Sequence, residues 1–217
     1  MAFPLKTQFL KFIGLLAYTA FLATTLLTAT SYGEKSTITD LSIAQLSLCS
    51  VTSLAVPIAL FIKKGGLKTM EWLVWIAIAI GCAFLAMDDR FMFHENLDKG
   101  IHALFQWEET KLSDRLDDII VGIYGLAGII FVTANRRYFN FSPRFLIFAR
   151  YALGLAFVMV VCDMRSIYGI DENFGNVLSH LEEWTKIFGG GFLLVGLLCA
   201  LEDALRLSRN PPFARNL

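Results

Sequence analysis

The stretch WLVWIAIAIGCAFLAMDD, residues 72–89, decides the fold of this chain. Its first 16 residues carry no charge, which as a helix rising about 1.5 Å per residue covers most of the hydrocarbon core of a bilayer. The apolar residues form a continuous block and do not alternate as they would in a transmembrane strand. The stretch then ends on two aspartates, and ionisable groups beside hydrocarbon tend to mark functional sites or tightly paired networks.

Blocks of similar length and character recur along the chain. Of its 217 residues 56% are hydrophobic and 18% are charged, whereas a soluble domain carries roughly 25% charged residues. The sequence therefore predicts one all-α domain, 1–217, that forms an integral membrane bundle of six transmembrane helices. The predicted helices span about 8–30, 42–62, 71–94, 118–135, 144–164 and 178–204.

The longest connection, residues 96–117 between helices 3 and 4, is not a plain polar loop. Ile101, Leu104, Phe105 and Leu112 recur there at roughly helical spacing between charged residues. This pattern predicts an amphipathic interfacial segment. His102 lies in this segment, and we expect its side chain to be solvated.

Charge divides between the two ends of the predicted helices. If the N-terminus is cytoplasmic, the cytoplasmic segments hold twelve of the 19 basic residues and only three of the 19 acidic residues. Basic residues concentrate on the cytoplasmic side of membrane proteins. We therefore expect a protein of the plasma (bacterial inner) membrane with both termini cytoplasmic and an acidic, histidine-containing end facing the periplasm or exterior. The basic residues are typical of those that flank transmembrane helices on the cytoplasmic side, so no nucleic-acid binding is expected.

Carboxylates and a histidine lie at the exterior ends of several predicted helices. Asp88 and Glu95 are seven residues apart and would share one face of helix 3, while Asp118 begins helix 4. His180 and Glu183 are three residues apart, so they are neighbours on helix 6. Helical bundles build metal sites from such groups on facing helices, and these residue types favour zinc, iron or manganese.

One hypothesis is therefore a metal-dependent enzyme that acts on a lipid or on another substrate at the outer leaflet. A bound divalent transition metal could activate water for hydrolysis. The predicted metal ligands are Asp88, Glu95, Asp118, His180 and Glu183, and the residues that would orient a ligand or act as a base are Asp89 and Asp163.

Two alternatives stay open beside the enzyme. The same charges could form a structural network in a non-catalytic accessory subunit of a larger membrane protein complex, or in a homo-oligomer. In such a network Asp89 would pair with Arg90 or with a neighbouring helix, and Glu182 would pair with Lys186. The second alternative is a cation or proton conductor, although few polar groups continue toward the cytoplasmic half.

Two strings resemble motifs of an uncharacterised family of bacterial multipass membrane proteins. LAMDDRFMFHE, residues 85–95, is similar to a leucine-aspartate-aspartate motif followed by histidine-glutamate at the end of a transmembrane helix. HLEEWTKIFG, residues 180–189, is similar to a second motif, a glutamate pair followed by lysine and glycine. A more distant similarity links the chain to the alkaline ceramidase and progestin-receptor-like membrane hydrolases, which bind zinc, although this chain lacks their late His-x-x-x-His pair. The resemblance supports the site residues and implies no particular activity.

Overall fold

The computed structural model describes residues 18–20, 22, 24, 37–106, 116–166 and 172–207, with the side chains of 164–166 and 172–173 left out. These residues form helices joined by short turns, and no strand occurs among them, which confirms the predicted all-α class. The elements are α2 (Thr37–Lys64), α3 (Thr69–Phe91), α4 (Phe93–Phe105), α5 (Leu116–Ala134), the 3-10 helix η2 (Arg136–Phe139), α6 (Pro143–Ser166) and α7 (Glu172–Arg206).

Five helices of the described part, α2, α3, α5, α6 and α7, are long and apolar enough to cross a membrane. They correspond to the second to sixth predicted helices, although α2 and α7 begin five or six residues earlier than predicted. The first predicted helix, 8–30, lies mostly outside the described residues, and those described within it are helical. A helical membrane bundle is therefore supported, and the additional span at 8–30, which would bring the number to six, stays a prediction.

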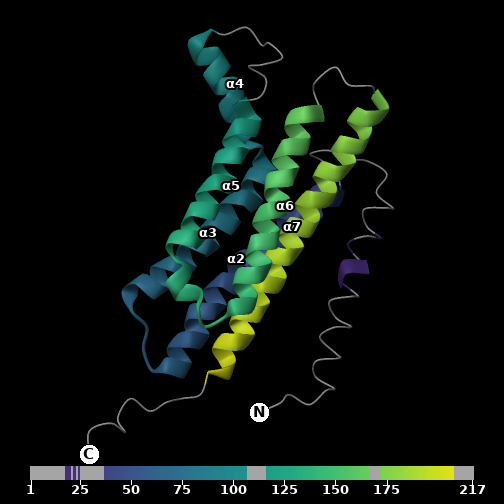
Figure 1. Cartoon of the computed structure of the whole chain (residues 1–217). Coiled ribbons are helices and arrows are strands. Elements are labelled where there is room, and N and C mark those ends of the chain that lie inside the picture. The colour runs from purple at the N-terminus through teal and green to yellow at the C-terminus, as the bar shows by residue number, and fades with distance from the viewer. Residues whose placement is uncertain are drawn as a thin grey trace, which may run out of the picture.

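The centre of the bundle is the contact between α2 and α7. α3 packs against the other side of α2, α6 packs along α7, and α5 lies against α6 (Figure 1). In the basic half, Trp75 of α3 stands edge-on to Phe139 and also contacts Phe145, with ring centroids 5.4 and 5.6 Å away. These rings fix the turn between α5 and α6 against α3. α5 is the least buried of the spanning helices.

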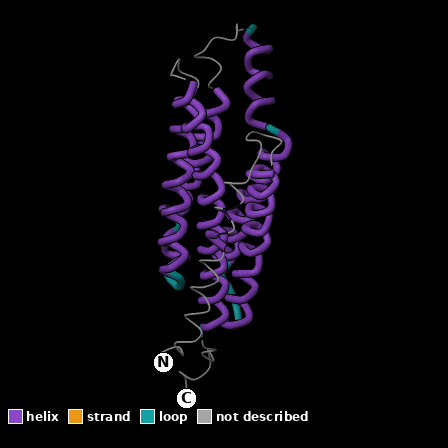
Figure 2. Tube along the Cα trace, turned by 90° about the vertical axis from the view of Figure 1, so that its right-hand side faces the viewer, coloured by secondary structure: helices purple, strands orange, loops and turns teal. Residues whose placement is uncertain are grey.

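The third predicted helix is interrupted. α3 ends at Phe91 because Met92 adopts the left-handed conformation, with φ 52° and ψ 49°, and its N–H donates to the Asp88 carbonyl at 2.7 Å. α4 restarts at Phe93 and projects beyond the end of α3 in both views (Figures 1 and 2). The prediction that Asp88 and Glu95 share a face of one helix is therefore wrong. α4 begins before the predicted amphipathic segment, 96–117, and covers its residues 96–105.

Candidate functional site

The site is the end of the bundle at which α3 gives way to α4. Asp88, in the last turn of α3, is 4% exposed. Its Oδ1 accepts the backbone N–H of His94 at 3.0 Å, and its Oδ2 lies 2.8 Å from the His94 Nδ1. This hydrogen bond raises the pKa of His94 above the usual 6.5, although burial of the ring opposes the shift. Asp88 thus holds the first turn of α4 and favours a charged imidazole there.

Asp89 points to a different part of the bundle because successive side chains of a helix lie about 100° apart. Its Oδ2 accepts a hydrogen bond from the Ser42 hydroxyl of α2 at 2.6 Å. Its Oδ1 lies 3.1 Å from the Lys186 Nζ of α7. One carboxylate therefore joins three helices.

The sequence predicted that Asp89 pairs either with Arg90 or with a residue of a neighbouring helix, and the structure shows the second. The neighbouring helix supplies Lys186, whose close ion pair is with Asp89, while the predicted partner Glu182 interacts with Lys186 at longer range. Arg90 instead reaches Asp40 at 3.8 Å, and both of those side chains are largely exposed. Exposed pairs of this kind add little stability.

α4 carries two further pairs at the spacing of one helical turn. The His102 Nδ1 lies 2.8 Å from the Asp98 Oδ1, and the Lys99 Nζ lies 3.3 Å from the Glu95 Oε2. His102 is only 6% exposed, so the prediction of a solvated His102 is wrong. Sequence reasoning missed the Asp98–His102 pair, although its four-residue spacing was visible.

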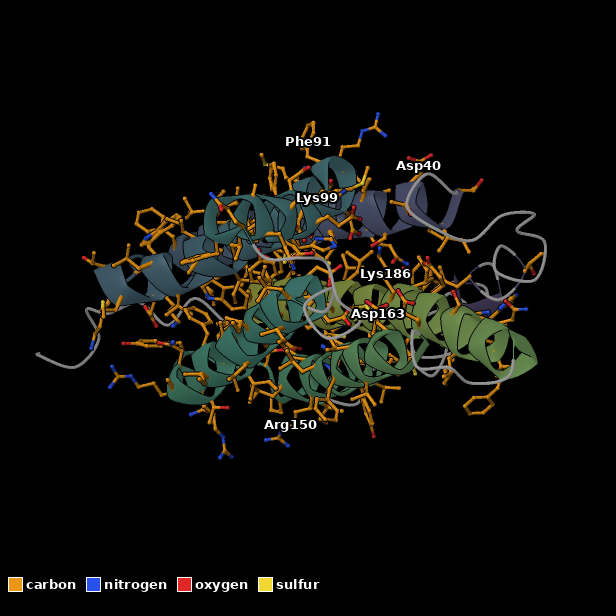
Figure 3. The ribbon with its side chains drawn as sticks, turned by 90° about the horizontal axis from the view of Figure 1, so that it is seen from above. Asp40, Phe91, Lys99, Arg150, Asp163 and Lys186 are labelled. Atoms are coloured by element: carbon orange, nitrogen blue, oxygen red, sulfur yellow. The ribbon has the colours of Figure 1, made fainter. Side chains whose placement is uncertain are left out.

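The remaining carboxylates come from α5, α6 and α7. Asp118 and Glu183 are 4% and 6% exposed, so both are enclosed by the bundle. Seen from above this end, Asp163 and Lys186 lie within the outline of the bundle, whereas Asp40, Phe91 and Arg150 lie at its edge (Figure 3).

Most of the longer-range interactions among these carboxylates are between like charges, which repel one another. Asp117 is within electrostatic range of Asp163, Asp98 and His94. Glu182 is in turn within range of Asp163, Glu183 and Lys186. In this set only His94 and Lys186 interact favourably with a carboxylate, so the attractive contacts of this end are those that bring a cation to an acid.

The predicted metal ligands do not form one compact group. Glu95 pairs with Lys99, and the exposed His180 has its Nδ1 2.6 Å from the Asn176 carbonyl of its own helix. Over the described ranges, no three His, Cys, Asp or Glu residues are placed to hold a metal ion together. Metal binding stays a prediction that rests on residue type.

The sequence analysis missed Ser42 as a partner in the site, and it assigned Lys186 to Glu182 and not to Asp89. Ser42 lies in the first turns of α2 and carries no distinguishing pattern. Lys186 is followed by apolar residues and glycines of α7, and a lysine so placed within an apolar helix indicates a buried ion pair. Its partner depends on how α3 and α7 pack, which the sequence does not specify.

Comparison with known proteins gives a family and no activity. A family model described as a domain of unknown function, DUF8692, matches residues 28–201. No curated protein and no solved structure was found to be similar to the chain.

Proposed function

Since the chain belongs to the DUF8692 family, described as a domain of unknown function, we propose a role from its own geometry: a non-catalytic accessory subunit of a larger membrane protein complex. The acidic end would be its docking surface. The partner would be a membrane protein that presents a basic segment on the same side.

The observation that supports this proposal is that ionisable side chains of the acidic end bind one another across helices. Asp88 accepts two hydrogen bonds from His94, and Asp89 is shared between Ser42 and Lys186. About half of the four or so lone-pair sites of each carboxylate are thus already used within the protein. Charge-assisted bonds of this geometry fix the relative positions of the helices that they join.

The projecting helix α4 supports docking. Three apolar side chains of α4 are 50%, 77% and 57% exposed, Leu97, Leu104 and Phe105, and the helix that carries them extends beyond the end of α3 (Figure 1). Exposed apolar side chains surrounded by charge are typical of protein interaction surfaces. Seven basic residues stand against sixteen acidic residues at this end by the topology deduced from the sequence, so a basic partner is complementary.

An enzyme acting at the outer leaflet is the second candidate, and the Asp88–His94 contact favours it. A buried carboxylate that orients an imidazole and stabilises its charged form is the arrangement used in acid–base catalysis. The His94 side chain is 23% exposed, so a substrate could reach it. Zinc, iron or manganese at the predicted ligands would belong to this candidate.

One preparation separates the two candidates. The protein is extracted from its native membrane into polymer nanodiscs, its assembly mass is measured by native mass spectrometry, and its metals are quantified. The test variant is Leu104→Ser with Phe105→Ser. The matched control is Leu205→Ser, which changes a 52% exposed leucine at the opposite end of the bundle.

An accessory subunit predicts a stoichiometric hetero-assembly that the double variant loses and the control keeps. A protein that migrates alone or only with copies of itself, unaffected by the double variant, would contradict the proposal. Near-stoichiometric metal that is lost in a His180→Ala, Glu183→Ala variant would instead establish the metal-dependent candidate.

A further inference from the structure

The basic end of the bundle contains a cavity between α5 and α6. It has a volume of about 450 Å³, and its walls include Ile129 and Val132 of α5 and Leu153 and Phe157 of α6. Arg136 and Arg150 also line it. The cavity is thus apolar along its length and carries two cations.

Both helices that form the cavity carry a glycine near it. α5 and α6 approach closely at Gly128, where an added Cβ would lie 3.5 Å from the Leu153 side chain. At Gly154, which lines the cavity, an added Cβ would meet nothing within 4 Å. Space is therefore open beside Gly154, and a larger side chain there would compete with a ligand of the cavity.

The two arginines lack the partners that neighbouring arginines have. Arg144 binds Glu202 and Asp203, and Arg137 donates to the Tyr138 hydroxyl at 2.8 Å. Within the described part of the chain, Arg136 and Arg150 make neither an ion pair nor a hydrogen bond. Arg150 points outward from the bundle (Figure 3).

Arg150 is also placed where a free cation is costly. It lies seven residues after the first residue of α6, about 10 Å along the helix axis at about 1.5 Å per residue. A charge at the margin of the hydrocarbon needs an anion or must extend to the headgroups. Guanidinium groups bind phosphate through paired, parallel hydrogen bonds.

We propose that this cavity binds one anionic phospholipid of the surrounding bilayer. Its phosphodiester lies between Arg136 and Arg150, and an acyl chain occupies the apolar channel beside Gly154. Basic pockets between transmembrane helices on the cytoplasmic side suit anionic headgroups, and this is the end that the charge distribution assigns to the cytoplasm. The site is independent of the acidic end and of the function proposed for it.

The test measures lipid retention by native mass spectrometry of the detergent-purified chain. Dioleoyl-phosphatidylglycerol, which is anionic, is compared with dioleoyl-phosphatidylcholine, which has the same chains and no net charge. The variants are Arg136→Gln with Arg150→Gln, and separately Gly154→Leu. The control, Lys63→Gln with Arg137→Gln, removes the same charge from the same end of the bundle.

We expect wild type and control to retain the anionic lipid about tenfold better than the neutral one, a difference near 1.4 kcal/mol. The Arg136/Arg150 variant should lose this preference, and Gly154→Leu should lose the bound lipid. Equal losses in the control and test pairs, or full retention by Gly154→Leu, would overturn the proposal. Displacement of the lipid by millimolar inorganic phosphate would overturn it too, because the acyl chain would then contribute nothing.

Discussion

Adjacent residues of α3 have different structural roles. Asp88 holds the start of α4 through His94, whereas Asp89 joins α2 and α7 through Ser42 and Lys186. Helical geometry predicts that neighbouring side chains diverge, so the sequence could show that the acidic cluster does not point one way. It could not show which partner each aspartate meets, because Asp89 meets Ser42, 47 positions earlier, and Lys186, 97 positions later.

Stability should depend on pH through His94. Its pKa is raised in the folded protein, so its contribution to the free energy of unfolding is fully present below about pH 6.5, the unfolded value. That contribution is lost as the pH rises through the folded-state pKa. His94→Gln should therefore lower the melting temperature, measured in detergent, more at pH 6 than at pH 9.

Two variants control this measurement. Asp88→Asn removes the negative charge that favours the protonated imidazole and should abolish the same pH dependence. His180→Gln changes an exposed histidine whose ring lies against the carbonyl of its own helix, and it should leave the dependence intact. An equal destabilisation by His94→Gln at both pH values would show that the ring acts by packing alone.

At the scale of elements, α2 and α7 approach closely at a glycine. A Cβ at Gly190 would lie 2.7 Å from the Gln45 Oε1, and the Gln45 Nε2 is fixed by a hydrogen bond of 2.8 Å to the Tyr18 hydroxyl. The buried amide of Gln45 thus fills the space that a side chain at position 190 would need.

Gly190→Ala should therefore destabilise the bundle by about 1–3 kcal/mol, the usual effect of overpacking, although alanine favours a helix over glycine by about 1 kcal/mol. Gly125→Ala is the matched control because its Cβ would meet nothing within 4 Å, and it should leave stability unchanged or raised. Thermal unfolding of both variants in the same detergent measures the difference. Similar melting temperatures for both would contradict close packing at Gly190.

The elements themselves were largely predictable, and the interruption at Met92 was not. Long apolar blocks predict spanning helices because their length matches the bilayer. A helix that ends in a left-handed residue usually has glycine or asparagine there. Methionine gives no such indication, so the apolar pattern from residue 71 to His94 predicted one continuous helix.

At the scale of the whole molecule, the uneven distribution of charge along the sequence places basic residues at one end of the bundle and acidic residues at the other. At the basic end Arg144 binds Glu202 and Asp203, and Ser142 donates to Asp203 at 2.6 Å, which ties α6 to the last turns of α7. At the acidic end the pairs join α2, α3, α4 and α7. The sequence predicted both ends, but the order in which helices pack depends on side-chain fit and could not be deduced.

The central claim is that the charges of the acidic end bind one another across helices, and a double-mutant cycle at Asp89 and Lys186 tests it most directly. Removal of one partner of a fully buried pair typically costs about 3–5 kcal/mol, and the cost should be smaller here because the Lys186 and Asp89 side chains are 22% and 16% exposed. Asp89→Asn and Lys186→Met should each destabilise the protein in detergent unfolding, and the double variant should lose much less than the sum of the two. Additive losses, with no coupling between the two sites, would contradict the account.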